Sequence, residues 1–214
     1  MKMNLGNKED RYSYGPFNHE VQIKKVVEVL KGLLPWQYQL TLLIADETIS
    51  VHDRLFWHKF KAFMSGNYKE LTQDDCRKLA SKLCEEEEND SFFRRMISYI
   101  DQVDCDEKAV FLNNVVRAFL NEEIVKYEMF LIYHAVVYTP YEDLLYLKQL
   151  EERHASRIPY SINIISLNGM GLVLPDSIDG GDFEYRPFIE YQRFAISELG
   201  KLTCKHALYD YREL

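Results

Sequence analysis

The segment Asn168-Gly-Met-Gly-Leu-Val-Leu-Pro175 marks the place where this chain changes its architecture. Gly169 suits the first position after a helix, where a left-handed backbone costs glycine little. The apolar run that follows predicts a strand over 172–174, and a polar, glycine-bearing stretch then predicts a loop. After the loop, 188–196 predicts a returning strand, and Ser197 predicts the cap of a closing helix.

Upstream of Pro159 the apolar residues recur three and four positions apart, which is the spacing of one face of a helix. A hydroxyl residue followed three positions later by an acid predicts helix starts at Ser50 and Thr72, because the oxygen accepts from a free backbone N–H. Thr139-Pro-Tyr-Glu142 has the form of a capping box with proline at the first helical position. We predict helices over 19–34, 36–46 and 50–64, further helices beginning near 72, 91, 106, 129 and 140, and a short helix over 160–167 for which a strand is the alternative.

Two of these helices carry predictions about burial. The helix around Leu112–Phe119 is predicted to turn four polar side chains toward water: Lys108, Asn113, Asn114 and Arg117. Met129–Tyr138 is apolar nearly all round and is interrupted only by His134, which predicts a helix in the centre of a bundle. A histidine there is a packed core residue in the simplest interpretation, and a base or ligand in the alternative.

The expected fold is therefore mainly α: a multi-helical bundle with a small C-terminal α+β, winged-helix-like element. Residues 1–18 lack a periodic pattern and are expected to form a loose N-terminal arm. Residues 19–157 are expected to form the helical core, and 158–214 a winged-helix-like tail packed on it. The length of 214 residues suits one large domain with a small appendage.

Composition restricts the class of partner and the compartment. The chain has 26 Lys and Arg against 34 Asp and Glu, a net charge of −8, which disfavours nucleic acid because cations must neutralise phosphates. The polar segment 1–17 lacks the apolar core of a signal peptide. Val26–Ala45 contains Glu28 and Lys31 and is too polar to span a membrane. We expect a cytoplasmic protein without a transmembrane segment.

Motifs that carry chemistry are missing. The four cysteines, at 76, 84, 105 and 204, form no C-x-x-C pair and are expected to be reduced, structural thiols. The histidines form no H-x-x-x-H pair, and His52 and His58 are expected to have one surface and one packing role. The acids over 101–107 lack the glycine of a calcium loop, and no phosphate-cradling loop occurs. We expect no catalytic, cofactor-binding or metal-ligating residues.

Two regions resemble known families. The tail, with Tyr191-Gln-Arg-Phe-Ala-Ile-Ser-Glu-Leu-Gly-Lys201, resembles the wing and closing helix of bacterial winged-helix proteins. Phe92–Leu150 resembles bacterial and mobile-element proteins with a TerB-like helical core, and the resemblance implies a compact helical fold. The residues that carry this second resemblance are Asp106-Glu-Lys-Ala109, Asn121-Glu-Glu-Ile124 and Asp143-Leu-Leu-Tyr-Leu147.

The tail departs from a DNA-binding winged helix in its charge. Five cations (Arg186, Arg193, Lys201, Lys205 and Arg212) stand against eight acids over 160–214, and Ser161–Leu167, the expected recognition helix, contains no cation. Base readout and phosphate anchoring both need donors there, so contact with protein is the favoured use of the tail.

We therefore expect a non-enzymatic interaction or regulatory protein that contacts a protein partner or a second copy of itself, as a component of a bacterial or mobile-element system. One alternative is a winged-helix transcriptional regulator that binds duplex DNA through Lys201 and Lys205. A second alternative is an enzyme or small-ligand binder with a site near His134. A membrane-surface role for the helical hairpin 23–44 is a further alternative.

Overall fold

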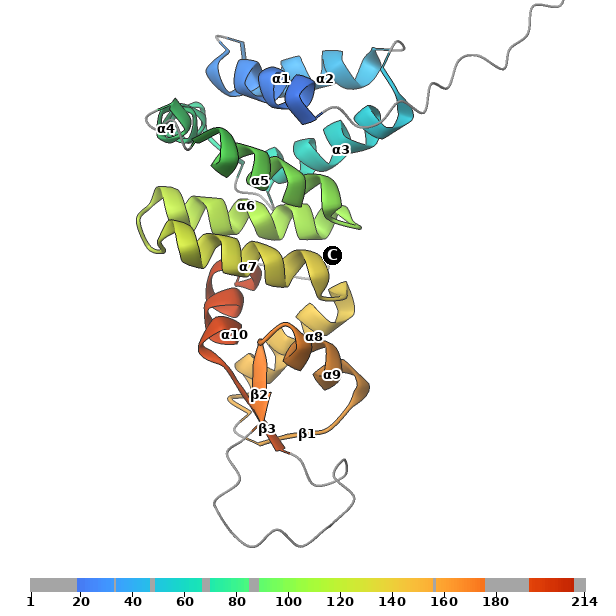
Figure 1. Cartoon of the computed structure of the whole chain (residues 1–214), viewed down its shortest axis with the longest axis vertical. Coiled ribbons are helices and arrows are strands. Elements are labelled where there is room, and N and C mark those ends of the chain that lie inside the picture. The colour runs from blue at the N-terminus through green and yellow to red at the C-terminus, as the bar shows by residue number, and fades with distance from the viewer. Residues whose placement is uncertain are drawn as a thin grey trace, which may run out of the picture.

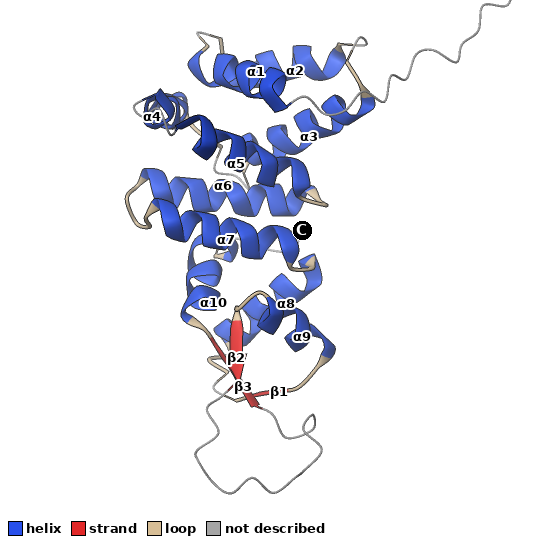
Figure 2. Cartoon of the chain, viewed as in Figure 1, coloured by secondary structure: helices blue, strands red, loops and turns tan. Residues whose placement is uncertain are grey.

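The computed structural model describes residues 19–32, 34–46, 49–66, 70–84, 89–155, 157–175 and 193–209. The molecule is elongated, and its helices lie in layers along the long axis (Figure 1). Two helices, α1 (His19–Lys31) and α2 (Trp36–Ala45), form one end, and a small antiparallel sheet lies at the other end (Figure 2). This arrangement confirms the expected fold class, mainly α with a small C-terminal α+β element.

The middle layers contain α3 (Val51–Ser65), α4 (Gln73–Cys84), α5 (Asn89–Gln102), α6 (Asp106–Leu120), α7 (Lys126–Tyr138) and α8 (Tyr141–Glu152). The C-terminal element contains β1 (Ile158–Pro159), α9 (Ile162–Gly169), β2 (Val173–Pro175), β3 (Arg193–Ile196), α10 (Glu198–Thr203) and a π-helix (Cys204–Leu208). The helix α1 ends three residues before the end predicted at Leu34, and α5 begins before the start predicted at Ser91.

Of the helix starts predicted at Ser50, Thr72 and Thr139, the first two are confirmed. The Oγ of Ser50 accepts from the N–H of Asp53 at 3.0 Å. The backbone N–H and Oγ1 of Thr72 donate to the Asp75 carboxylate at 3.0 and 2.7 Å, and Thr72 Oγ1 accepts from the Asp75 N–H at 3.1 Å. The predicted capping box at Thr139 is wrong, because Pro140 is the residue directly before α8. Its backbone is extended, with φ −51° and ψ 143°, as is that of Pro35 directly before α2, with φ −53° and ψ 133°. Thr139 Oγ1 is buried without a hydrogen-bond partner among the described residues.

The central helix is α6, which contacts α3, α4, α7 and the π-helix. Its burial corrects the prediction for three of the four polar residues expected in water, because Lys108, Asn113 and Asn114 are all buried. Each is accepted in the core because its nitrogen donates to a backbone carbonyl of another helix: Val137 at 3.2 Å, Phe63 at 2.6 Å and Ala207 at 2.8 Å respectively. Arg117 is half-buried, and its Nη1 donates to the Glu70 carbonyl at 3.2 Å.

The helix α7 is mostly buried, as predicted, but its histidine is not. Met129, Ile132, Tyr133 and Val136 lie in the core, whereas His134 is exposed. The expectation of a buried histidine was wrong because a 13-residue helix of apolar residues still leaves one narrow strip uncovered when neighbours pack around it.

The C-terminal sheet has the strand order β1-β3-β2, and both pairs are antiparallel. The predicted strand after the glycines is confirmed as β2, the predicted returning strand is confirmed over β3, and the short helix is confirmed as α9. The left-handed glycine is Gly171, with φ 72°, and not Gly169, which still belongs to α9. The predicted loop over 176–182 lies outside the described residues.

The closing helix begins as Ser197 predicts, and the motif Ser197-Glu-Leu-Gly200 has a clear structural use. The Ser197 Oγ accepts from the Gly200 N–H at 2.9 Å and donates to the Gly171 carbonyl at 2.5 Å. A Cβ on Gly200 would lie 2.1 Å from the carbonyl oxygen of Leu172. Glycine is therefore required at 200, because the backbone of Leu172, just before β2, approaches the backbone of α10 closely there.

The C-terminal helical segment, α10 and the π-helix, packs against the helical bundle. The π-helix packs on α6 and α8, and α10 packs on α7. The division into a core, 19–157, and a tail, 158–214, stays a prediction, and the expected arm over 1–18 lies outside the described residues. The side chain of Cys84 and residues 85–88 of the acidic run 85–90 lie outside them as well. Within the described residues, no helix is long and apolar enough to cross a membrane.

Candidate functional site

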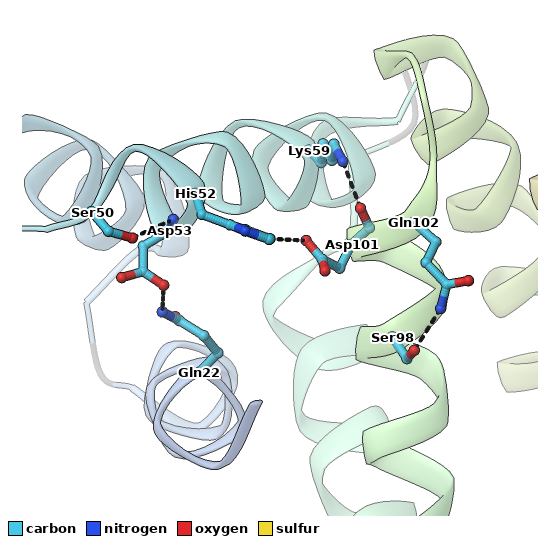
Figure 3. A network of polar contacts seen from close by, with 8 residues as sticks. All are labelled: Gln22, Ser50, His52, Asp53, Lys59, Ser98, Asp101 and Gln102. Carbon is cyan, nitrogen blue, oxygen red and sulfur yellow. Dashed lines mark hydrogen bonds and ion pairs between the residues drawn. The ribbon is translucent and has the colours of Figure 1, made fainter. Parts of the chain in front are cut away.

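A polar cluster joins α3 to the C-terminal end of α5 (Figure 3). The Nε2 of His52 lies 3.3 Å from Oδ1 of Asp101, and the Lys59 Nζ donates to the Asp101 carbonyl at 2.5 Å. The His52 side chain is half-exposed and the Asp101 side chain is largely buried. A histidine beside a carboxylate is an arrangement that catalytic sites use, so the surroundings decide what it does here.

The surroundings of the cluster favour a structural role. Lys59 places a cation on a carbonyl in the last turn of α5, where helices carry partial negative charge. Gln102, the next residue, donates to the Ser98 Oγ at 2.7 Å and accepts from the Tyr138 hydroxyl at 2.5 Å. These contacts fasten the end of α5 to α3 on one side and to α7 on the other. His58 is also exposed, so the expected packing role for one of this histidine pair is wrong.

His134 has aromatic neighbours. Its ring centroid lies 4.6 Å from that of Tyr138 and 6.4 Å from that of Tyr99. Together with Tyr127 and Leu131, which are 71% and 37% exposed, His134 and Tyr138 form one exposed line along α7. We call these four residues the α7 stripe. The arrangement suits contact with another apolar surface, because aromatic rings and a leucine side chain offer apolar area that carries little charge.

His206 is a buried histidine that the sequence did not single out. It lies in the π-helix, and its Nδ1 is 3.6 Å from a carboxylate oxygen of Glu123. Desolvation lowers the pKa of His206, and Lys205 lowers it further, while Glu123 and Glu128 act in the opposite direction. The imidazole is therefore neutral at neutral pH, and its burial beside one half-exposed carboxylate indicates a packing role.

The three cysteines whose side chains the structure describes, Cys76, Cys105 and Cys204, lack the properties of nucleophiles. Burial is the first cause that raises the pKa of the Cys76 thiol to about 12, of Cys105 to about 11 and of Cys204 to about 12. All three are free thiols, and a thiol with so high a pKa carries almost no reactive thiolate at neutral pH. Among the described side chains, no three His, Cys, Asp or Glu residues lie close enough together to hold a metal ion.

The C-terminal element exposes an apolar surface of its own. The helix α9 buries Ile164 and Leu167 and leaves Ile162 82% and Ile165 53% exposed. Two apolar residues in or beside the strands are exposed as well, and we call the four the C-terminal apolar surface: Tyr160, Ile162, Ile165 and Leu174. Ile162 and Ile165 lie three positions apart on one helix face, and exposed apolar side chains that adjoin one another mark a candidate contact surface.

The rigid mounting of α9 strengthens that interpretation. The Asn163 Nδ2 donates to an Asp143 carboxylate oxygen in α8 at 2.5 Å, which fixes the rotation of α9 on the bundle. The two isoleucines are three positions apart and lie on one helix face, so this hydrogen bond holds them outward together. The sequence signal was available in the run Ile162-Asn-Ile-Ile165, but its helical conformation was needed to show which isoleucines face water.

Lys201 and Lys205, which the DNA-binding alternative needs, do not lie on α9. Lys201 is exposed, and its Nζ donates to Glu198 at 2.7 Å, a contact that raises the pKa of the lysine. Lys205 is exposed in the π-helix. Neither is on α9, whose sequence Ile162–Gly169 has no cation. The helix that would read bases therefore lacks the charged donors that groove contacts use.

The described residues form a mainly α-helical bundle that exposes apolar side chains along α7 and on the C-terminal element, among other places. Comparison with protein-family models, with curated proteins and with solved structures finds no match to the chain.

Proposed function

We propose that this protein is a non-enzymatic interaction protein, and that its C-terminal apolar surface docks on a protein partner in the cytoplasm. The observation that carries the proposal is the 82% exposure of Ile162 on a helix that is fixed to the bundle. Removing such a side chain from water contributes roughly 1.5–3 kcal/mol, and its fixed position lowers the entropy lost on binding.

Charge supports a protein partner over a nucleic acid. The surface consists of isoleucine, leucine and tyrosine side chains, and α9 brings no cation that would neutralise a phosphate. The resemblance of the tail to a winged helix then concerns the shape of the element, whose exposed helix is used for docking. A regulatory role in a bacterial or mobile-element system remains part of this proposal.

Site-specific cross-linking tests the proposed function. A photoreactive amino acid at position 162, in protein expressed in its native cytoplasm, is expected to give one dominant cross-linked protein partner. The same amino acid at position 55, where the leucine is 57% exposed on α3, is the matched control and should not give that product. Ile165→Glu should remove the position-162 product without changing the melting temperature, because the side chain lies outside the core.

The result also separates the alternatives. Absence of any protein product at position 162, together with salt-dependent binding of duplex DNA that Lys201→Glu and Lys205→Glu abolish, would replace the proposal with the transcription-factor alternative. Products of equal yield from positions 162 and 55 would show that exposure alone explains the cross-link.

A further inference from the structure

Asn168 and Gly169 form an Asn-Gly pair at the C-terminal end of α9. Asn168 is the only asparagine of the chain that precedes a glycine, and both residues of the pair are exposed. In such a pair the backbone nitrogen of the glycine can attack the side-chain carbonyl carbon of the asparagine, because the glycine has no Cβ to hinder the approach. The pair therefore carries all the groups for a chemical change that needs no enzyme.

The reaction is the intramolecular deamidation of Asn168. The Gly169 nitrogen gives up its proton and bonds to Cγ of Asn168, the Cγ–Nδ2 bond breaks, and the amide leaves as ammonia. Water then opens the resulting succinimide ring at one of its two carbonyl carbons. Opening at Cγ gives aspartate, and opening at the backbone carbonyl carbon gives isoaspartate, in which the main chain runs through the side chain. Water is consumed and ammonia is released, so the reaction requires no oxidant, reductant or other co-reactant.

The fold controls how readily the pair reacts. The helical backbone at Asn168 holds the Gly169 nitrogen away from Cγ, so the last turn of α9 must open before the ring can close. That opening lies at a helix end, where local unfolding costs least. A Cβ on Gly169 would meet nothing within 4 Å, so the space beside the glycine is open to this movement.

The other asparagines whose side chains the structure describes are less suited to the reaction. Asn113 and Asn114 are buried, and their side-chain nitrogens donate to backbone carbonyls. Asn163 donates to a carboxylate in α8 and precedes a β-branched residue, which crowds the attacking nitrogen. Asn121 is exposed but precedes a glutamate. Sequence and exposure therefore select Asn168.

Deamidation would change the surroundings of the C-terminal apolar surface. Asn168 follows Ile165 by three positions and lies beside it on α9. A carboxylate there must lose water when a partner covers the isoleucine, and it also stands at the negative end of the helix dipole. Isoaspartate lengthens the main chain inside the turn in which the Leu172 N–H donates to the Leu167 carbonyl at 2.8 Å. Both products therefore disfavour docking on this surface.

We propose that Asn168 is a site of spontaneous deamidation, with the Gly169 nitrogen as nucleophile and water as the second reactant, and that the product weakens docking at the C-terminal apolar surface. The second half of this proposal rests on the proposed function, whereas the first half does not. A chain would then carry an intact docking surface when it is new and lose it as it ages.

Peptide mass spectrometry of the purified full chain, incubated at mildly alkaline pH, tests the modification. Trypsin cleaves after Arg157 and Arg193, so Asn163 and Asn168 share one peptide and Asn163 serves as the internal control. The mass change of an amide-to-acid conversion is expected at Asn168 first, as aspartate and isoaspartate, at a rate that rises with pH. Gly169→Ala should slow it at least about fivefold, because alanine holds the helix end closed more firmly and its Cβ hinders the nitrogen.

Cross-linking from position 162 in the native cytoplasm tests the effect on docking. Asn168→Asp, which has the charge of the product, is expected to lower the yield of the cross-linked partner by roughly two- to fivefold, as fits one charge at the edge of an interface. Asn168→Gln keeps an amide and should retain the wild-type yield. Asn121→Asp is the matched control, since it makes the same change at the exposed C-terminal end of α6 and should also retain that yield. Thermal melts show whether each variant is folded.

The outcomes separate the two halves of the proposal. Conversion of Asn168 no faster than that of Asn163, or equally fast in Gly169→Ala, would overturn the modification site. Equal cross-linking yields from Asn168→Asp and the wild type would overturn the effect on docking. A chain that gives no cross-linked partner from position 162, yet deamidates at Asn168, would refute the proposed function and leave the modification site standing.

Discussion

The side-chain amide of Asn114 donates a hydrogen bond of 2.8 Å to the backbone carbonyl of Ala207, which lies 93 positions further along the chain. Asn114 belongs to the central helix α6 and Ala207 to the π-helix, and both residues are buried. This bond joins the helical layers to the C-terminal element at a place where water cannot replace it. A buried carbonyl that loses its donor is costly, so the contact gives a direct measure of how strongly the two parts depend on each other.

Asn114→Ala is therefore expected to lower the free energy of unfolding by about 2–3 kcal/mol, from the unpaired Ala207 carbonyl and the space left in the core. Urea unfolding followed by circular dichroism measures the change. Asn168→Ala, at an exposed position in α9, serves as the matched control and should change stability by less than about 0.5 kcal/mol. Equal effects of the two substitutions would mean that the buried bond contributes little.

Gly200→Ala is expected to destabilise the C-terminal element, because its Cβ would lie 2.1 Å from the Leu172 carbonyl oxygen. Overpacking in a core costs about 1–3 kcal/mol, and a backbone atom cannot turn aside as a side chain can. Gly169→Ala is the internal comparison: a Cβ there meets nothing within 4 Å, and alanine favours a helix over glycine. Thermal melts should show a lower melting temperature for Gly200→Ala and an equal or higher one for Gly169→Ala.

Asp104→Asn is expected to lower stability more than Lys108→Met does. Lys108 is almost completely buried, and Asp104 is its carboxylate partner at 3.0 Å. Removing the carboxylate leaves a buried ammonium, whereas methionine fills a similar volume without charge. We expect a cost of about 1–2 kcal/mol for Asp104→Asn, below the 3–5 kcal/mol of a fully buried pair because Asp104 faces water. A larger loss for Lys108→Met in chemical denaturation would contradict this account.

The same pair predicts part of the acid sensitivity. Desolvation acts to raise the pKa of Asp104, but the hydrogen bond and charge of Lys108 outweigh it and the pKa is lowered. A lowered carboxyl pKa adds stability above the unfolded value near 3.9, and this stability is lost as the pH falls through the folded pKa. Asp104→Asn should therefore show a smaller loss of stability than the wild type between roughly pH 4 and pH 2.

His206 predicts a second pH dependence in a different range. Burial lowers its pKa from the ordinary value of 6.5, so the unfolded chain binds the proton more readily than the folded one. Stability is complete above that value and declines as the pH falls below it toward the folded pKa. His206→Gln should flatten the dependence between pH 7.5 and the lower pKa, as measured by urea unfolding at a series of pH values. His58→Gln, at an exposed histidine, is the control for the substitution itself.

Local patterns predicted much of the fold, because they depend on neighbours in sequence. Ser50, Thr72 and Ser197 each stand directly before a helix, as predicted. The side-chain oxygen of each accepts a hydrogen bond from the expected backbone N–H. Lys108, Asn113 and Asn114 were misplaced because polarity alone assigns them to water. Their carbonyl partners lie 29, 50 and 93 positions away, and no local pattern contains that information.

The candidate surfaces were less predictable for a related reason. An apolar residue on a helix is expected inside, and the sequence of α7 offers apolar residues on every side. Which strip stays open depends on where α5, α6 and α10 pack. The exposure of Ile162 depends likewise on the bond between Asn163 and Asp143, whose partners come from two helices.

The π-helix over Cys204–Leu208 has a consequence for insertions and deletions. Its hydrogen bonds close over five residues where those of an α-helix close over four, so each turn accommodates one residue more. Removing one residue from this segment would allow an ordinary helix to form, with better local geometry. Residues beyond the deletion would keep nearly the same rotation about the axis, whereas an ordinary α-helix that retained all five residues would turn Ala207 away from Asn114 and His206 from Glu123. Here the number of residues, as much as their chemistry, determines which side chains meet the central helix.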